Sequence, residues 1–304
     1  MDSNGTVSLP HAAVVILNWN DEPTTARALE SLRLADLCGA DIILVDSASK
    51  DGSAENLKQR FPEIHLLQLP ENRGYAGGCN AGIQEALARG CEAVFVMNND
   101  IVVAPDFLRP LLEKASKPNV GVVVGKIYLP GEPTRFQSAG ASINNWTGET
   151  CNRFEGEEDA GQGESEFQPD YLMGAAILLT RRLVEKIGAF DERLFIYYEE
   201  TDLCVRAKQA GFEVVYVPGS RVWHCEKPRR KTSKLSWEQY YMLRNRIVFM
   251  RRYADALQRL VFRIYLILYR IPRELARSFL GRAGKPGNVF RAVHDGMRFP
   301  LWKE

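Results

Sequence analysis

Four short apolar runs alternate with amphipathic segments in the first third of the chain. The runs read AAVVILNW, DIILVDS, IHLLQL and AVFVMNND, and each is apolar throughout rather than at alternate positions. The segments TTARALESLRLA, SKDGSAENLKQRF and PDFLRPLLEKAS predict helices, the first of which has Asp21 and Pro23 at its start. Apolar strands that alternate with helices are typical of a parallel sheet covered on both faces, so the pattern predicts an α/β fold.

Polar residues stand at the ends of three of these runs. Asn18 closes the first run, Asp46 closes the second, and Asn98, Asn99 and Asp100 close the fourth. A glycine-rich segment, residues 71–82, follows the third run. Because ligands of such sheets bind at the carboxyl ends of the strands, we expect these four segments to face one crevice.

The glycine-rich segment reads ENRGYAGGCNAG and precedes a helix-like run, IQEALARG. Its glycines do not fit the dinucleotide fingerprint, which needs them at offsets zero, two and five. Gly77 and Gly82 have the spacing of a P-loop, but Ile83 and Gln84 stand where a P-loop has Lys and Ser or Thr. Two interpretations stay open at this point: a backbone that approaches a ligand closely, and a tight turn from strand to helix.

The pattern changes from about residue 118. Shorter strand-like pieces, VGVVVGKIYL and FQSAGASI, precede an acidic, glycine-rich stretch at 148–168, whose composition predicts a solvated loop. Residues 236–280 are expected to be helical, with Arg252, Arg259, Arg263, Arg270, Arg273 and Arg277 at steps of three, four or seven. This apolar run is too short, and too interrupted by Arg263, to span the roughly 30 Å hydrocarbon core of a bilayer. The helix either lies in a membrane interface or packs on its own domain with a solvated basic face.

Charge is distributed unevenly along the chain. Residues 1–226 carry a net charge of −13, whereas residues 227–304 have 19 Lys and Arg against 5 Asp and Glu, a net of +14. Such asymmetry suggests a polyanionic partner, and the absence of a nucleic-acid-binding motif favours an anionic membrane surface over nucleic acid. The six cysteines lack C-x-x-C spacing and the N-terminus lacks a secretory pattern, so we expect reduced thiols and a cytoplasmic catalytic part.

Three groups of residues carry candidate chemistry. Asp100, flanked by Asn98 and Asn99, is a candidate ligand for a divalent cation. Glu199, Glu200 and Asp202 stand within four residues at a predicted helix start, beside Phe195, Tyr197 and Tyr198, which would raise the proton affinity of one carboxylate toward that of a useful base. His224, after a short strand-like run, becomes a candidate metal ligand only if Asp100 is one too.

Seven blocks in a fixed order carry a family resemblance. They read VVILNWN, ILVDSASKDGS, ENRGYAGGCNAGI, NNDIVVAPDFL, GAAILLTRRLVEKIGAFDERLFIYYEETDLCVRAKQAGF, VYVPGSRVWH and YYMLRNRIVF. Over residues 12–250 the chain resembles the family 2 inverting glycosyltransferases of the GT-A fold, in particular the rhamnosyltransferases and galactofuranosyltransferases of cell-wall and O-antigen polysaccharide synthesis. The resemblance implies a mostly parallel central sheet with helices on both faces and a C-terminal helical extension.

The resemblance also implies roles for individual residues. Asn18, Asp46, Asn98 and Asn99 match nucleotide-sugar-binding positions, and Asn72, Arg73 and Gly74 match a segment that lies against the nucleotide and the donor sugar. Asp100 and His224 match ligands of Mg²⁺ or Mn²⁺, Glu200 matches the catalytic base, and Glu199 and Asp202 would orient the acceptor or cap the helix. Two positions depart from the family pattern: Asn98 replaces the first acid of the D-x-D metal motif, and Glu200 replaces the commoner Asp.

The expected reaction is a transfer of sugar, with inversion, from a nucleotide-diphosphate sugar to a saccharide or a polyprenyl-diphosphate-linked acceptor. The donor suggested by the resemblance is dTDP-rhamnose, and UDP-galactofuranose is the alternative. A catalytically decayed nucleotide-sugar-binding module is a rival interpretation. We expect residues 1–117 to bind the nucleotide sugar, residues 118–235 to bind the acceptor and catalyse, and residues 236–304 to bring the protein to the inner face of the plasma membrane.

Overall fold

The computed structural model describes residues 9–131, 134–225, 234–281 and 283–301. The chain divides into two compact units. The sheet unit comprises residues 1–142, 152–195 and 199–226, and the helical unit comprises residues 143–151, 196–198 and 227–304. The N-terminal residues 1–8, on which the expectation of no secretory signal partly rests, and the basic residues at 227–233 lie outside the described residues.

The sheet unit holds a single large sheet. Its strands are β1 Ala12–Asn18, β2 Asp41–Asp46, β3 His65–Gln68, β4 Ala93–Asn98, β5 Ile101–Val103, β6 Val120–Leu129, β7 Arg135–Ser138, β10 Ala176–Thr180 and β11 Glu213–His224. Its helices are α1 Glu22–Arg33, α2 Ser53–Arg60, α3 Gly74–Ala88, α4 Leu108–Ala115, α5 Arg181–Ile187, the 3-10 helix η1 Glu192–Leu194, and α6 Glu199–Gln209. A short hairpin of β8 Ala141–Ile143 and β9 Thr150–Asn152 stands apart from this sheet.

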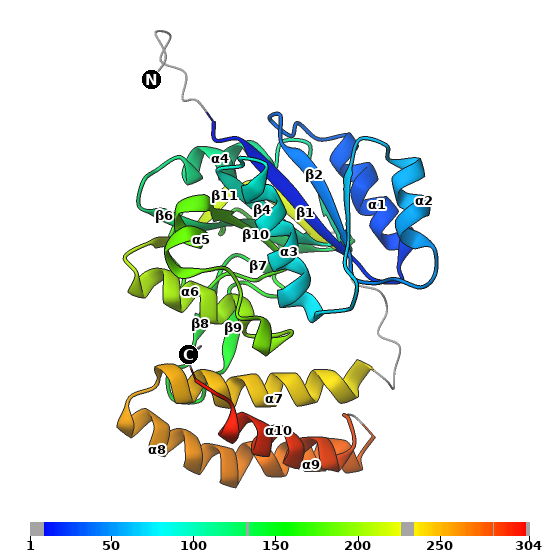
Figure 1. The fold of residues 1–304 in the computed structure, drawn as a ribbon. Coiled ribbons are helices and arrows are strands. Elements are labelled where there is room, and N and C mark those ends of the chain that lie inside the picture. The colour runs from blue at the N-terminus through cyan, green and yellow to red at the C-terminus, as the bar shows by residue number, and fades with distance from the viewer. Residues whose placement is uncertain (1–8, 132–133, 226–233, 282, 302–304) are drawn as a thin grey trace. The chain divides into compact units, whose positions relative to one another are not determined.

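The sheet is mixed, and its parallel part comes from the apolar runs. Strand order is β3-β2-β1-β4-β10-β6-β11-β5, with β7 paired to β6. Figure 1 labels all of these strands except β3 and β5. The four strands from β3 to β4 are parallel, β10 runs antiparallel to β4 and β6, and β11 is parallel to β6. The prediction of an α/β fold with a mostly parallel core is therefore confirmed for the first half, and the antiparallel β10 divides it from the second.

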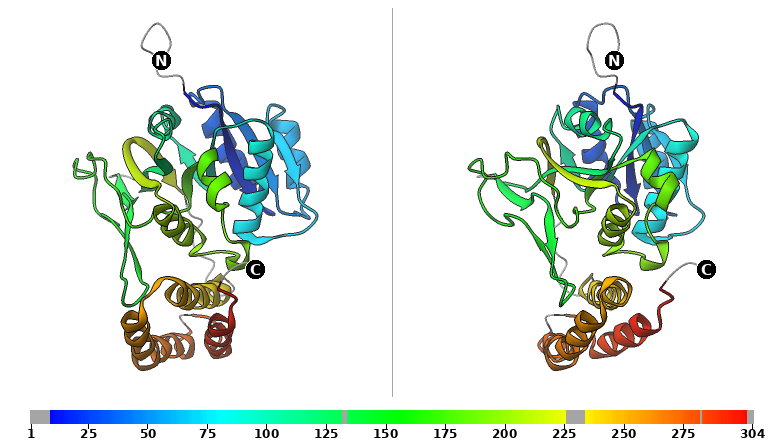
Figure 2. Two further views of the ribbon diagram at one scale, coloured as in Figure 1. Left: turned by 60° about the vertical axis from the view of Figure 1, so that its left-hand side comes forward. Right: turned by 90° about the vertical axis from the view of Figure 1, so that its left-hand side faces the viewer.

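Helices cover both faces of the parallel strands, which explains why β1 is apolar throughout (Figures 1 and 2). Val15 and Leu17 of β1 contact α3, because a Cβ added at Gly82 or Gly78 would meet them at 2.4 Å. Asn18, which points to the opposite face, bonds to Thr25 of α1. Asp21 and Pro23 begin α1 as predicted, although the Asp21 side chain makes no capping hydrogen bond.

Most of the glycine-rich segment is helix, so of the two interpretations left open, that of a tight turn is wrong, and close approach to a ligand stays a prediction. Helix α3 already begins at Gly74, so three of the four glycines form its first turns. Gly74 adopts a φ of +72°, and a Cβ there would lie 2.4 Å from the ring of Phe195. The glycines therefore allow α3 to approach the sheet and Phe195 closely, at positions where any larger side chain would collide.

The acidic stretch at 148–168 is not simply a solvated loop. It contains β9, and its Asp159 accepts a hydrogen bond of 2.9 Å from Lys126 of β6, a lysine only 3% exposed. Glu164 also pairs with this ammonium, and Tyr128 donates to Asp159. Composition suggested solvation because a buried cation on a distant strand leaves no local trace in the acidic stretch itself.

The helical unit contains α7 Lys234–Tyr253, α8 Ala256–Tyr265, the π-helix η2 Leu266–Arg270, α9 Ile271–Phe279 and α10 Pro286–Arg298. The predicted helix over 236–280 is thus broken before α8, where Asp255 forms a capping box with Gln258. Helix α10 was not predicted. It packs on α7 (Figure 2), where a Cβ at Gly296 would lie 3.0 Å from the carbonyl oxygen of Arg244. Among the described residues, no helix combines the length and the apolar character needed to cross a bilayer.

Within the helical unit, Asn245 of α7 holds the residues that precede Glu199 in the chain. Its fully buried amide donates hydrogen bonds of 2.9 and 2.7 Å to the carbonyl oxygens of Ile196 and Tyr197. Tyr197 and Tyr198 have φ values of +67° and +68°, in the left-handed region that costs a non-glycine residue roughly 1–3 kcal/mol. The Asn245 bonds offset part of this cost and fix where the backbone turns toward α6.

The contact between α3 and the sheet can be tested at Gly82. A Cβ there would lie 2.4 Å from Val15 and 2.8 Å from Val45, so Gly82→Ala should destabilise the protein by about 1–3 kcal/mol in urea denaturation. Gly287→Ala in α10, where nothing lies within 4 Å of the new Cβ, is the matched control and should be neutral or slightly stabilising. Equal effects at both positions would contradict the close packing of α3.

Candidate active site

The parallel register brings three predicted residues to one edge of the sheet. Asn18 stands opposite Asp46, and Leu17 stands opposite Asn98. Each of the three is the last residue of its strand, so their side chains gather where β1, β2 and β4 end. This edge is the carboxyl edge expected to bind ligands.

Asn18 and Asp46 are buried and hold each other. The Asn18 amide donates to Asp46 Oδ1 at 2.8 Å and to Ser53 Oγ at 2.8 Å, and its carbonyl oxygen accepts from Thr25 at 2.7 Å. The second oxygen of Asp46 accepts the backbone N–H of Ser49 at 2.9 Å. With exposures of 0% and 2%, Asn18 and Asp46 lie beneath the surface of this edge, and we call them its floor.

Asp100 and His224, 124 residues apart, are in direct contact. The imidazole Nε2 lies 3.1 Å from Asp100 Oδ1. The antiparallel pairing of β5 with β11 causes this contact, because His224 stands opposite Ile101 and the backbone N–H of Cys225 donates to the Asp100 carbonyl at 2.7 Å. The structure therefore brings together the two side chains that the sequence suggested as partners.

The other ring nitrogen of His224 determines what Nε2 can do. Nδ1 lies 2.8 Å from the carbonyl oxygen of the Gln137 side chain, so Nδ1 carries a proton and donates it. In the neutral ring, Nε2 then turns its lone pair toward the Asp100 carboxylate. Two acceptors at 3.1 Å repel each other unless a proton or a cation lies between them. A histidine that ligates a metal usually donates its other ring N–H to a hydrogen-bond partner, as Nδ1 does here.

Asn98 adds an oxygen to this region. Its side-chain Oδ1 is buried and has no hydrogen-bond partner among the residues that the structure describes. The amide of Asn99 donates to Thr25 at 3.0 Å, and Thr25 in turn donates to Asn18. Carboxylate, imidazole and amide oxygen are ligand types that Mg²⁺ or Mn²⁺ accepts, so Asp100, His224 and Asn98 stay candidate ligands.

The segment Asn72–Gly74 opens α3 at the same edge. Asn72 Oδ1 accepts the backbone N–H of Gly74 at 2.8 Å. The guanidinium of Arg73 pairs with Glu192 at 2.5 Å, and the backbone of Ala76 bonds to the carbonyl oxygen of Phe195 at 3.1 Å. These contacts join the start of α3 to the chain just before α6.

Glu199 and Glu200 begin α6 and differ in exposure. Glu199 is 4% exposed, and its Oε2 has no hydrogen-bond partner within the described ranges. Glu200 is half-buried and packs on Gly174, where an added Cβ would lie 3.1 Å from the Glu200 Cβ. Burial raises the pKa of Glu200 to about 7, although hydrogen bonds from the first turn of α6 oppose the rise. The direction of this shift agrees with the expectation that the environment would raise the proton affinity of one carboxyl, and the role of Glu200 as a base stays a prediction.

Short contacts connect Glu200 with the end of β4. Gly174, which packs on Glu200, is followed by Ala175, whose carbonyl oxygen accepts the backbone N–H of Asn98 at 2.9 Å. The hydroxyl of Tyr75 in α3 donates to the Gly174 carbonyl oxygen at 2.7 Å. The candidate base therefore lies at the same carboxyl edge as Asn98 and the segment that leads to Asp100.

Asp202 is occupied within the protein. Its carboxylate accepts from Arg206, one turn along α6, at 2.7 Å, and it is 2% exposed. Arg206 also donates to the carbonyl oxygens of Ile187 and Ala189, after α5. This pair anchors α6, so of the two roles expected for Asp202, it favours one within the helix over orientation of an acceptor.

Comparison with known proteins identifies the family. Residues 13–188, more than half of the chain, match the family described as glycosyl transferase family 2. The chain belongs to glycosyl transferase family 2. The resemblance of the seven sequence blocks is confirmed, and the protein is a glycosyltransferase.

Three curated proteins are similar in sequence to this family 2 glycosyltransferase. It is 30% identical over 236 residues to the N-acetylglucosaminyl-diphospho-decaprenol L-rhamnosyltransferase of Mycobacterium tuberculosis, covering 69% of this chain and 75% of that protein. It is 22% identical over 210 residues to the dTDP-rhamnosyl transferase RfbF of Shigella flexneri, covering 69% and 67%. It is 25% identical over 263 residues to galactofuranosyltransferase GlfT2 of Mycolicibacterium smegmatis, covering 78% and 40%.

Solved structures confirm the GT-A fold of this glycosyltransferase. A structure of GalNAc-T7 with UDP, GalNAc and Mn²⁺ has a TM-score of 0.69 at 18% identity, covering 97% of this chain and 59% of that one. The mannosyltransferase PcManGT of Pyrobaculum calidifontis, in complex with GDP-Man and Mn²⁺, has a TM-score of 0.59 at 16% identity, covering 97% and 77%. At such identities the likeness concerns the fold alone.

Several residues at the edge of this glycosyltransferase escaped sequence analysis. Gln137 and Thr25 contact candidate site residues but belong to none of the seven blocks, and Gly174 begins the fifth block without having been singled out. A second group that could hold a metal ion, His11, Asp41 and Cys91, has ligand atoms within 4.8 Å of one another. It stands near the amino ends of β1, β2 and β4, at the opposite edge, and Asp41 is already paired with Arg89 at 3.1 Å.

The raised pKa of Glu200 predicts a pH-dependent effect on stability. A carboxyl whose pKa rises from 4.5 to about 7 on folding favours the unfolded state once that state ionises, so its cost develops above about pH 4.5 and is complete above pH 7. Glu200→Gln should therefore raise the melting temperature at pH 8 by several degrees and change it little at pH 5, in metal-free thermal unfolding.

The control for this experiment is Glu113→Gln, which alters an exposed acid on α4. This variant should melt like the wild type at both pH values. An equal shift of the Glu200→Gln variant at pH 5 and pH 8 would show that the carboxyl does not ionise with a raised pKa.

Proposed function

We propose that this glycosyltransferase moves L-rhamnose, with inversion at the anomeric carbon, from dTDP-rhamnose to a lipid-linked saccharide during synthesis of a cell-surface polysaccharide. The observation that carries the reaction class is the convergence of an Asp100–His224 pair and a half-buried Glu200, from three distant segments, on one carboxyl edge. The choice of rhamnose is supported by the names of two relatives, from Mycobacterium tuberculosis and Shigella flexneri.

Glu200 acts in this proposal as the general base. With a pKa of about 7, its carboxylate is present at neutral pH and still basic enough to accept a proton from an acceptor hydroxyl. The hydroxyl oxygen attacks the anomeric carbon from the side opposite the diphosphate, the bond to the diphosphate oxygen breaks, and the configuration inverts. Glu199, buried beside it, would orient the acceptor or cap the helix, and Asp202 fixes α6 through Arg206.

Asp100, His224 and Asn98 would hold a divalent cation, Mg²⁺ or Mn²⁺. The lone pair of Nε2 turned toward a carboxylate and the unpartnered Oδ1 of Asn98 fit this role. When bound, such an ion neutralises the negative charge that develops on a departing nucleoside diphosphate. Gln137 keeps the imidazole in the tautomer that a metal needs.

Residues 1–117 would bind the nucleotide sugar in this scheme. Asn18 and Asp46 form the floor beneath the base, and Asn99 and the Asn72–Arg73–Gly74 segment border the donor. Residues 118–235 would supply the acceptor side and the base. A polyprenyl-diphosphate-linked acceptor would place the reaction at the inner face of the plasma membrane, and it is supported by the decaprenol-linked substrate in the name of the mycobacterial relative.

A second donor has a specific argument in its favour. UDP-galactofuranose is supported by the likeness to a galactofuranosyltransferase, and the same edge residues would serve it. A decayed module that only binds nucleotide sugars is disfavoured, because the Asp100–His224 contact and the raised pKa of Glu200 persist together.

Turnover of nucleotide sugars tests the proposed function. With Mn²⁺ and a panel that includes dTDP-rhamnose and UDP-galactofuranose, the wild type should release nucleoside diphosphate fastest from dTDP-rhamnose. Glu200→Gln should lower this rate by at least about 10³-fold while the affinity for dTDP stays within a few-fold, because the base acts on the acceptor and not on the nucleotide. Undiminished turnover in the variant would remove Glu200 from its role.

Binding of Mn²⁺ tests the proposed cation site apart from catalysis. In titrations followed by electron paramagnetic resonance, His224→Ala and Asp100→Asn should each weaken Mn²⁺ binding strongly. Gln137→Ala should weaken it by about 10-fold to 100-fold through the lost orientation of the ring. His65→Ala, on β3, is the control and should leave the titration unchanged, because His65 pairs with Glu85 and belongs to neither group of candidate metal ligands. Equal Mn²⁺ affinity in all variants would refute the site.

A further inference from the structure

The C-terminal helices bury polar side chains on one side and expose apolar ones on the other. The outer face of α8 and η2, defined here by Leu257, Leu260, Ile264, Ile267 and Leu268, has exposures of 60%, 54%, 51%, 62% and 74%. These positions recur at steps of three or four, so they form one stripe along the helix. Single exposed leucines are ordinary, but a contiguous stripe of five large aliphatic side chains requires an explanation.

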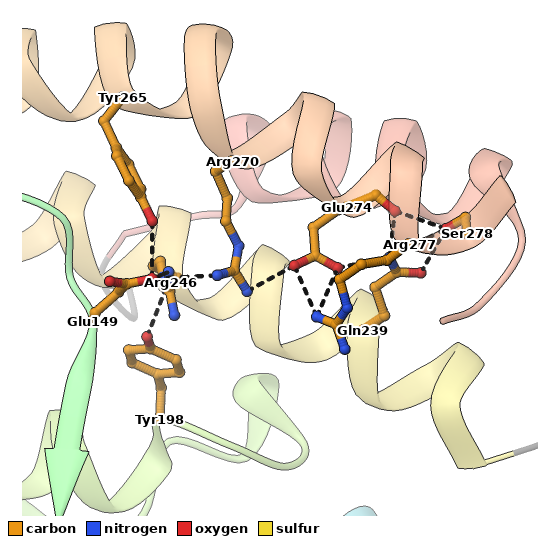
Figure 3. A network of polar contacts seen from close by, with 9 residues as sticks. All are labelled: Glu149, Tyr198, Gln239, Arg246, Tyr265, Arg270, Glu274, Arg277 and Ser278. Carbon is orange, nitrogen blue, oxygen red and sulfur yellow. Dashed lines mark hydrogen bonds and ion pairs between the residues drawn. The ribbon is translucent and has the colours of Figure 1, made fainter. Parts of the chain in front are cut away.

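The inner side of the same helices is already occupied, so this stripe cannot be explained by an alternative packing of the unit. Phe262 and Leu266 point inward and are buried. Farther along, the inner contacts are ionic (Figure 3): Arg270 lies 3.3 Å from Glu149 and 3.0 Å from Glu274, which is 1% exposed. Rotating the helix to bury the stripe would expose Phe262 and break this network.

The network itself fixes the rotation of the helices. Glu149 accepts from Arg246 of α7 at 3.1 Å and from Tyr265 of α8 at 2.9 Å (Figure 3). Glu274 accepts from Gln239 of α7 at 2.8 Å. Burial would raise the pKa of Glu149, but the hydrogen bonds and cations around it outweigh burial and lower it, so this carboxylate stays charged and paired. The polar side of α8 and η2 therefore faces the interior of the helical unit, and the apolar stripe is exposed.

Cations border the apolar stripe, and acids are missing from it. Residues 256–273 contain four arginines and no Asp or Glu. Arg270 belongs to the buried network, whereas Arg259, Arg263 and Arg273 are exposed. A stripe of aliphatic side chains with exposed arginines beside it matches the two layers of a membrane interface, acyl chains below and anionic headgroups above.

We propose that the outer face of α8 and η2 docks on an anionic lipid bilayer, with the five aliphatic side chains entering the interface and Arg259, Arg263 and Arg273 contacting headgroups. A second copy of the chain fits less well, because a symmetric contact through this face would bring like charges together. The inference deepens the proposed function, since a lipid-linked acceptor lies at such a surface, but its test uses no catalytic step.

Vesicle sedimentation of the full chain tests this docking. The wild type should sediment with phosphatidylglycerol-containing vesicles at low salt, bind less at high salt, and bind poorly to pure phosphatidylcholine. Leu260→Gln with Ile264→Gln should reduce binding to the anionic vesicles by about ten-fold or more, because two interfacial side chains are lost. Arg259→Gln with Arg263→Gln should remove most of the salt dependence.

The matched control is Leu34→Gln, since Leu34 is an isolated leucine of the sheet unit with 80% exposure. It should bind vesicles like the wild type, and all variants should keep the wild-type melting temperature. Wild-type protein that stays in the supernatant with anionic vesicles would overturn the proposal. A dimer in light scattering that Leu260→Gln with Ile264→Gln dissociates would assign the face to a second copy instead. Vesicle binding without any nucleotide-sugar turnover would leave the docking intact and refute the proposed function alone.

Discussion

The parallel register of β1, β2 and β4 is the constraint on which the candidate site depends. Because of this register, the three strands end at the same edge of the sheet, and Asn18, Asp46 and Asn98 become neighbours. In sequence, 28 residues separate Asn18 from Asp46 and 52 separate Asp46 from Asn98. The pairing of β5 with β11 then adds Asp100 and His224 to that edge. Backbone hydrogen bonds therefore do the positioning, and the polar side chains need only be of the right chemical type. A slip of one residue in either pairing would turn these side chains to the opposite face of the sheet.

Burial is used at this edge in two different ways. Asn18 and Asp46 are buried with their hydrogen bonds satisfied, so they rigidify the floor at little electrostatic cost. Glu199 and Glu200 are placed in a poorly solvated region without a cationic partner among the contacts described above, and burial raises the pKa of both. The second arrangement costs stability and leaves carboxyl groups with raised pKa values, as is common where proton transfer occurs. The left-handed residues Tyr197 and Tyr198 add to this cost just before α6, and Asn245 offsets part of it.

Sequence reasoning reached the parts of the structure that leave a local signature. Uninterrupted apolar runs predicted β1, β2, β3 and β4, and the polar residues after them predicted the edge. Reasoning failed where a distant partner decides the outcome. A turn and a close approach to a ligand were the interpretations considered for the glycines of α3, because nothing local shows that Leu17, Val15 and Phe195 pack against them. The acidic stretch was taken for a loop because Lys126 lies on another strand, and Gln137 went unnoticed because its role exists only through His224. The roles of the individual site residues remain predictions.

The C-terminal helices show why periodicity alone could not decide between membrane contact and internal packing. A sequence with both arginines and aliphatic residues on a helix has two sides, and the usual assumption is that the apolar side faces the protein. Here Glu149, from the segment between β8 and β9, reverses that assumption, because its carboxylate binds Arg246, Tyr265 and Arg270 and draws the polar side inward. Glu149 and the buried Glu274 together determine which surface the helices expose. Because breaking the ion pair of Glu274 with Arg270 would leave a buried charge without its partner, the polar side stays inside and the apolar stripe stays exposed.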